Sequence, residues 1–169
     1  MKKLLAFGAG NNRIETLPND FFKLKELKII CLHSNRLTEL SEKIENLSSL
    51  KSIRISNNYR IATLPKSIVQ LKQLEQLAIE NTQISEIPIE LLTTTTLNKL
   101  SVNDNLLQFL IENINYLDVD MINLSASNFK SSSPILKDLN LKIDTEVYMD
   151  EKDKKENGCV LLSKNEKKD

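Results

Sequence analysis

The chain repeats one pattern of residues at intervals of about 23 positions. In most copies, apolar residues occupy positions 1, 4, 6 and 11, and asparagine often occupies position 9. The third copy has one extra residue before its last apolar position, and the seventh matches only at positions 1, 4 and 6. The second copy shows the pattern in Leu27, Ile30, Leu32, Asn35 and Leu37. Copies begin near residues 4, 27, 50, 74, 97, 114 and 136, so the spacings are 23, 23, 24, 23, 17 and 22 residues. Because one such unit is too short to bury its own apolar face, the pattern predicts a stack of similar units.

Each unit is expected to contain a short strand and a return segment. The alternating apolar positions 4 and 6 are typical of a strand that turns one face inward, and neighbouring units would pair these strands into a parallel sheet. An asparagine at position 9 lies where the strand ends, and its amide can satisfy backbone groups there. Three units then contain an apolar residue and a proline, at Leu17-Pro18, Leu64-Pro65 and Ile87-Pro88. Since proline has no N–H for a sheet ladder, the chain has left the sheet at these points.

The two halves of the unit, L-x-x-L-x-L-x-x-N-x-L and L-P-x-x-I-x-x-L, resemble the leucine-rich-repeat family over residues 4–147. The second half is similar to the intracellular Ras-suppressor-type and bacterial classes of that family. The resemblance implies an α/β solenoid, or horseshoe, with a parallel concave sheet of about seven strands and short helical or irregular convex segments. We assign residues 1–149 to this repeat domain.

The pattern weakens toward the C-terminus. The fifth unit has only 17 residues before the sixth begins at Ile114, with Leu117 and Val119 as its strand residues, so we expect the array to change curvature near residues 108–113. In residues 150–169, 12 of 20 are charged and the repeat is lost, which predicts a disordered tail.

The overall composition narrows the class of partner. Lysine plus arginine equals aspartate plus glutamate at 23 each, so no net field attracts the whole molecule to nucleic acid or to an anionic membrane. No stretch approaches the ~20 apolar residues needed to cross a bilayer. The two cysteines, Cys31 and Cys159, are far apart and offer no disulfide framework, which favours a reducing, cytoplasmic compartment. A secreted or cell-surface location is the alternative, because the apolar start of the chain faintly resembles a secretion signal.

Candidate binding residues are those that the repeat itself does not require. Side chains at positions 3, 5 and 7 alternate away from the core toward the concave face, and positions 8 and 10 lie at its rim. The residues selected on this basis are Arg13, Cys31, His33, Arg36, Arg54, Tyr59, Arg60, Glu80, Asn103, Asp104, Tyr116, Asp118 and Asp120. Their order predicts a face that is basic toward the N-terminus and acidic toward the C-terminus. Such a face would dock a partner whose charges have the opposite distribution. The alternative is a mixed surface that serves only solubility.

The predicted function is protein binding by a monomeric adaptor or scaffold that uses its concave face and needs no cofactor. The alternatives are a structural module of a larger multidomain protein and a bacterial secreted or surface protein. Enzymatic activity is not expected. Cys31 and His33 lie two residues apart on one strand, but an open sheet supplies no water-excluding pocket for a thiolate–imidazole pair. One histidine and two distant cysteines do not form a usual zinc site either.

Overall fold

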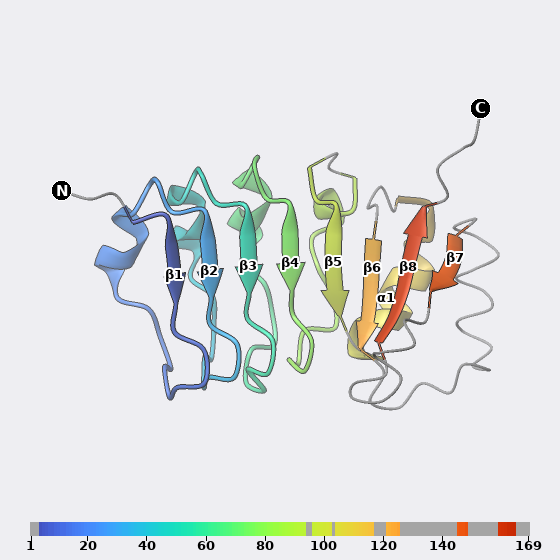
Figure 1. The fold of residues 1–169 in the computed structure, drawn as a ribbon, viewed down its shortest axis with the longest axis horizontal. Helices are drawn as coiled ribbons and strands as arrows, with labels where there is room; N and C mark the ends of the chain where they lie inside the picture. The colour runs from blue at the N-terminus through green and yellow to red at the C-terminus, as the bar shows by residue number, and fades with distance from the viewer. Residues whose placement is uncertain are drawn as a thin grey trace.

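The computed structural model describes residues 4–93, 96–102, 104–116, 121–125, 145–148 and 159–164. Its strands form one sheet of eight, in the order β1-β2-β3-β4-β5-β6-β8-β7 (Figure 1). Strands β1 to β6 pair in parallel, and β8 and β7 complete the sheet in antiparallel pairs. The strands are β1 (Ala6–Gly8), β2 (Ile29–Cys31), β3 (Ser52–Arg54), β4 (Gln76–Ala78), β5 (Lys99–Val102), β6 (Met121–Ser125), β7 (Thr145–Tyr148) and β8 (Cys159–Lys164). No helix in these ranges is long and apolar enough to span a membrane.

The register of the sheet follows the repeat. Position 4 of each unit pairs with position 4 of the next, so that Ile30 pairs with Ile53, and Leu77 pairs with Leu100. These four side chains are completely buried, because they point from the sheet toward the return segments. The parallel sheet predicted for the first five units is therefore confirmed, and the molecule is a solenoid with an open sheet on one side.

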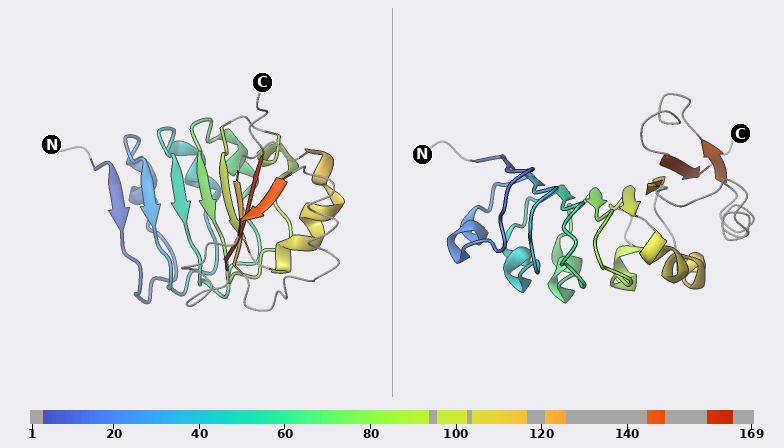
Figure 2. Two further views of the ribbon diagram at one scale, coloured as in Figure 1. Left: turned by 45° about the vertical axis from the view of Figure 1, so that its right-hand side comes forward. Right: turned by 90° about the horizontal axis from the view of Figure 1, so that it is seen from below.

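The return segments lie on the other side of the sheet, where they form short helices (Figure 2). They are the 3₁₀ helices η1 (Asn19–Lys23), η2 (Glu42–Asn46), η3 (Lys66–Gln70), η4 (Ile89–Leu91) and η5 (Ile114–Tyr116), and the α-helix α1 (Asp104–Glu112). Pro18, Pro65 and Pro88 directly precede η1, η3 and η4. Proline fits there because its fixed φ suits the extended approach to a helix and no donor is needed.

The N-terminal end of the stack is filled by aromatic side chains. The Phe7 ring contacts the Phe21 ring edge to face with centroids 5.1 Å apart, and Phe21 contacts Phe22 in the same way at 5.7 Å. Phe21 and Phe22 are buried, whereas Leu4 and Leu5 have exposed fractions of 43% and 49%. The first unit is therefore packed on one side only.

The sixth unit differs from the prediction. Ile122 of β6 pairs with Leu100 of β5, so these two units are 22 residues apart rather than 17. The segment predicted to contain the sixth strand begins instead with η5, and the chain before it forms α1. The physical reason is the burial of apolar side chains on one side of α1, namely Leu106, Leu107 and Leu110. This burial favours a helix after β5, so the next strand begins later in the sequence.

The C-terminal segment also differs from the prediction. Cys159–Lys164, expected to lie in a disordered tail, form β8 and pair antiparallel with β6. The apolar run within β8 can supply a strand although the surrounding residues are charged. The parallel seventh strand predicted around Leu139 and Leu141 lies outside the described residues, as does the domain boundary after residue 149.

Candidate binding face

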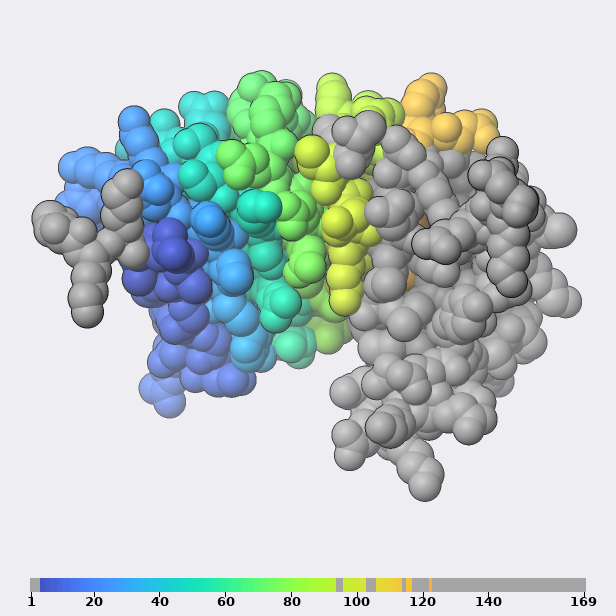
Figure 3. All heavy atoms as spheres, turned by 45° about the horizontal axis from the view of Figure 1, so that its top comes forward, coloured from blue at the N-terminus to red at the C-terminus, as the bar shows by residue number. Residues whose placement is uncertain are grey.

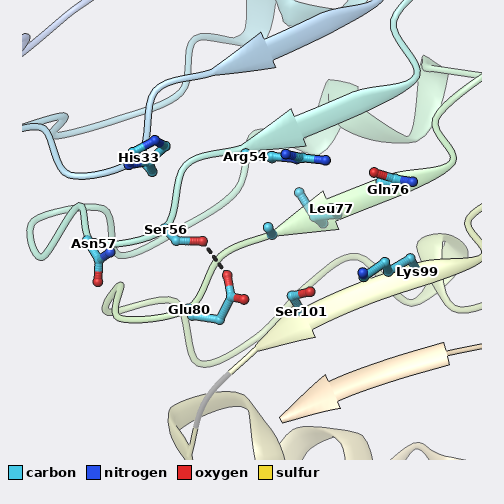
Figure 4. A pocket seen from close by; sticks show the side chains of 10 residues that line it. His33, Arg54, Ser56, Asn57, Gln76, Leu77, Glu80, Lys99 and Ser101 are labelled. Atoms are coloured by element: carbon cyan, nitrogen blue, oxygen red, sulfur yellow. Dashed lines mark hydrogen bonds between the residues drawn. The ribbon is translucent and has the colours of Figure 1, made fainter. Parts of the chain in front are cut away.

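The sheet face is the surface formed by the outward side chains at positions 3, 5 and 7 of the strands. Its middle contains a shallow hollow of about 410 Å³ (Figure 4). The hollow is open to solvent and is formed by strands β3 to β5 and the ends of β2 to β4. Its lining residues are His33, Arg54, Ser56, Asn57, Gln76, Leu77, Ala78, Glu80, Lys99 and Ser101. We call this feature the central hollow.

Two cations flank the central hollow. Arg54 on β3 pairs in register with Ala78 on β4, and Gln76 pairs in register with Lys99 on β5. Arg54 and Lys99 therefore lie on either side of β4, where the small side chain of Ala78 leaves space. The ion pairs formed by the described residues are Lys23–Asp20 and Lys51–Glu75, so neither of these cations has a carboxylate within 4.0 Å. Among the described residues, therefore, no carboxylate competes with an anionic group from outside for either cation.

The other half of the central hollow carries a carboxylate. The Ser56 hydroxyl donates a hydrogen bond to the Glu80 carboxylate across the β3–β4 junction. Figure 4 places Arg54, Gln76 and Lys99 in one half of the hollow, and His33, Ser56 and Glu80 in the other. The hollow therefore offers positive charge and negative charge to the same partner at separate points.

His33 is positioned by a glycine in the neighbouring unit. A Cβ atom on Gly10 would lie 2.5 Å from His33 Nε2, so the imidazole occupies the space that a side chain would fill. His33 Nδ1 also lies 3.4 Å from Ser34 Oγ. Cys31 is a free thiol and is half-buried. Among the described hydrogen bonds none joins Cys31 to His33.

The rim of the sheet face follows the strands at position 8 of each unit. Asn11, Ser34, Asn57 and Asn81 all have a positive φ, between 53° and 58°. Asparagine tolerates this left-handed conformation better than most residues because its short amide bonds locally. Asn57 Nδ2 donates to Ser34 Oγ at 3.4 Å, and Asn81 Nδ2 donates to Asn57 Oδ1 at 2.7 Å. The rim is therefore an ordered row of side chains that links three units.

A second hollow, of about 500 Å³, lies on this rim. Arg13, Arg36 and Tyr59 line it, and each occupies position 10 of its unit. All three side chains are exposed. We call this feature the rim hollow.

The structure brings together part of the predicted set. His33, Arg54 and Glu80 line the central hollow, and Arg13, Arg36 and Tyr59 line the rim hollow. Cys31 lies on β2, and Arg60 is exposed next to Tyr59. Asn103, Asp118 and Asp120 lie outside the described residues.

Two other predicted residues are placed differently. Tyr116 belongs to η5 and has an exposed fraction of 53%, so its assignment to a sheet strand is wrong; it followed from the wrong register of the sixth unit. Asp104, which was selected as a position-8 residue of the rim, is the first residue of α1. The positive φ found at position 8 of the first four units is thus replaced in the fifth unit by the start of a helix.

The predicted set omits Gln76, Lys99 and Ser101 from the central hollow. They occupy positions 3 and 5 of their units, the same outward positions that led to Arg54, so the repeat register could have identified them. Lys99 also places a cation beyond Glu80, in the part of the face that was predicted to be acidic. Among the side chains of this chain that are placed, no group of three or more histidine, cysteine, aspartate or glutamate residues could hold a metal ion.

The first five units present successive bands across the surface of the molecule (Figure 3).

In comparison with known proteins, the family model described as Leucine rich repeat matches residues 10–59. The structure of a leucine-rich-repeat protein of Leptospira interrogans is similar, with 28% sequence identity and a TM-score of 0.60. The match covers 70% of this chain but only 31% of that protein. No curated protein matches this chain.

Proposed function

Because the chain is a leucine-rich-repeat protein, we propose that it is an adaptor or scaffold that binds another protein through its sheet face. Solenoids of this kind commonly use their open sheet as an extended binding surface. The observation that carries the proposal is the central hollow, where Arg54 and Lys99 lack a carboxylate partner within the described chain. Charges left unpaired on an ordered surface favour a partner that brings the opposite charge.

The size of the sheet limits how a partner binds. Six parallel strands have five spacings of ~4.8 Å, so this part of the sheet is about 24 Å wide. A standard interface buries about 800 Å² on each partner. Strands of three to five residues do not reach that area alone. We therefore expect the partner to contact the rim as well as the sheet face.

The expected setting follows from composition. Cys31 is a free thiol, which fits a reducing, cytoplasmic compartment. The zero net charge gives no general attraction to nucleic acid or to an anionic membrane. We propose that the chain is a monomer that meets its partner there.

The test is an affinity capture with three forms of the protein. The wild type is compared with Arg54→Glu/Lys99→Glu, which reverses charge in the central hollow, and with Lys23→Glu/Lys66→Glu, which makes the same change on the 3₁₀ helices of the opposite side. Proteins captured from the source cell are identified by mass spectrometry, and their affinities are then measured. We expect the face variant to lose at least about tenfold in affinity, or ~1.4 kcal/mol, and the control to retain binding. Equal binding by all three forms would refute the proposal.

A second candidate is a repeat module that acts within a longer array. The observation that favours it is the first unit, where Ile14 and Leu17 are only half-buried although their counterparts Leu37 and Leu40 in the second unit are buried. Another repeat stacked on β1 would bury these apolar residues. Sequencing the gene on both sides tests the idea, because it requires further repeat units in the same reading frame.

A further inference from the structure

The rim hollow has a composition that differs from that of the central hollow. It lies where the chain leaves β1, β2 and β3, and Arg13, Arg36 and Tyr59 project there from three consecutive units. Tyr59 has an exposed fraction of 64%, although a tyrosine ring has a large apolar area. Exposed tyrosine and arginine residues in a hollow are the types that most often dominate the energy of protein interfaces.

The electrostatics of the rim hollow are one-sided. Arginine is its only charged residue type, and no acidic residue lines it. Neither Arg13 nor Arg36 takes part in an ion pair of the described chain. Each guanidinium carries five N–H donors in a planar arrangement that matches a carboxylate with two parallel hydrogen bonds. Two such groups in adjacent units repel each other unless an anion lies between or beside them.

Four of the seven residues that line the rim hollow already donate their backbone N–H to a backbone carbonyl: Asn12, Ser34, Arg36 and Asn57. Phosphate sites usually surround the anion with several free backbone N–H groups. Here the Asn12 N–H donates to Ser34 O at 3.2 Å, and the Arg36 N–H donates to Ile14 O at 2.9 Å. The Asn57 amide group is also engaged, with Ser34. The arginine side chains are the charged donors that line the rim hollow, and an arginine fork alone fits a carboxylate well.

We propose that the rim hollow is a docking site for an acidic segment of a partner protein. Its aspartate or glutamate carboxylates would bind Arg13 and Arg36, and its chain would pack against the exposed ring of Tyr59. Asn57 lines both hollows, so one partner could extend from the rim hollow into the central hollow. The inference thus extends the proposed protein-binding function, but it concerns a separate site and can fail while the sheet face still binds.

A direct binding experiment tests this site without knowledge of the partner. Fluorescein-labelled hexaglutamate is titrated with the full chain, and anisotropy is recorded at ~20 mM and ~150 mM salt, since screening weakens exposed ion pairs. Hexaglutamine is the uncharged control peptide. The rim variant Arg13→Gln/Arg36→Gln is compared with Arg54→Gln/Lys99→Gln in the central hollow and with Lys23→Gln/Lys66→Gln on the opposite side. Each pair removes two positive charges, and thermal melting by circular dichroism verifies that each variant is folded.

The proposal requires that hexaglutamate binds the wild type, that salt weakens this binding, and that hexaglutamine does not bind. We expect the rim variant to lose roughly tenfold in affinity, more than Arg54→Gln/Lys99→Gln loses, and Tyr59→Ala to lose about threefold, while Lys23→Gln/Lys66→Gln loses less than about twofold. Absence of hexaglutamate binding overturns the inference. An equal loss in all three double variants would show only diffuse charge attraction, and a loss confined to Arg54→Gln/Lys99→Gln would assign acidic segments to the central hollow instead. Both of those results also overturn the inference.

Discussion

The asparagines at position 9 of the second and third units, Asn35 and Asn58, each connect their unit with the unit before it. Asn58 is fully buried, and its amide nitrogen donates to Leu32 O at 3.0 Å, to Ile55 O at 2.7 Å and to Ser56 O at 3.3 Å. Its Oδ1 accepts a hydrogen bond from Leu37 N at 3.0 Å. One side chain thus satisfies backbone groups of two units at the end of the sheet, where the ladder no longer can.

Replacement of Asn58 by alanine should therefore be costly. Backbone groups would remain buried without these hydrogen bonds, and each such group costs about 1–3 kcal/mol. We expect Asn58→Ala to lower the free energy of unfolding by roughly 3 kcal/mol, measured by urea denaturation. The matched control is Asn12→Ala: Asn12 is exposed and bonds only to Ala9 O and Gly10 O in its own unit, so its loss should cost less than about 1 kcal/mol. Equal losses at the two positions would contradict this role for Asn58.

Adjacent 3₁₀ helices are also connected, by a carboxylate. Glu42 of η2 accepts hydrogen bonds from Ser67 N at 2.9 Å and from Lys66 N at 3.1 Å, at the start of η3. These are N–H groups that a helix start leaves without an internal partner. The N–H of Ser67 is the main cause that lowers the pKa of Glu42 from its ordinary value of 4.5, since the bonds favour the charged form.

The lowered pKa of Glu42 predicts a pH-dependent contribution to stability. The contribution is fully present above pH 4.5, the value in the unfolded chain, and is lost as the pH falls from there through the lower pKa of the folded state. Glu42→Gln should therefore destabilise the protein more at pH 7 than at pH 3, as measured by urea denaturation at each pH. Glu45→Gln in the same helix controls for the removal of one carboxylate. A difference between wild type and Glu42→Gln that is the same at both pH values would exclude the linkage.

The first five strands were predictable because their pattern is local. Alternation at positions 4 and 6, as in Ile53 and Ile55, is visible in sequence and corresponds to burial in the structure. The sixth strand was not, because Leu117 and Val119, which lie outside the described residues, offer the same alternation in sequence as Ile122 and Leu124, which lie in β6. The charges of the central hollow were partly predictable from register, whereas its depth depends on how neighbouring side chains pack.

The corrected register can be tested at Ile122. Its exposed fraction is 2%, and it continues the buried row formed by Ile53, Leu77 and Leu100. Truncation of a buried isoleucine typically costs about 2–5 kcal/mol, so Ile122→Ala should lower the unfolding free energy in that range. Ile53→Ala, at the same position in the third unit, provides the reference. A loss below about 0.5 kcal/mol at Ile122, with the normal loss at Ile53, would mean that the sixth unit has a different register.

At the scale of the whole molecule, each unit is stabilised by its neighbours. Strand β3 lies between β2 and β4, whereas within the described residues β1 has a partner strand only on the β2 side. The stability of such a stack is close to a sum of unit and interface terms, so an end unit with one interface opens more readily than a central one. Leu4 and Leu5, which are exposed beside β1, lack the burial that would offset this difference.

Hydrogen exchange of backbone amides can measure the difference, because two pairs of amides have the same place in their units. In the first pair, Ala9 N donates to Cys31 O and Ile55 N donates to Ala78 O, both at 2.9 Å. In the second pair, Asn11 N donates to His33 O at 2.9 Å and Asn57 N donates to Glu80 O at 2.8 Å. Since the hydrogen bonds are matched, different exchange rates would report unit opening rather than local geometry. We expect Ile55 and Asn57 to be protected at least ~10-fold more strongly than Ala9 and Asn11, measured by NMR in deuterated buffer after correction for intrinsic rates. Equal protection would mean that the stack opens only as a whole. A partner that docks on the rim hollow would then stabilise every unit equally. Under the expected result, docking at Arg13 and Arg36 should instead slow exchange mainly in the first two units.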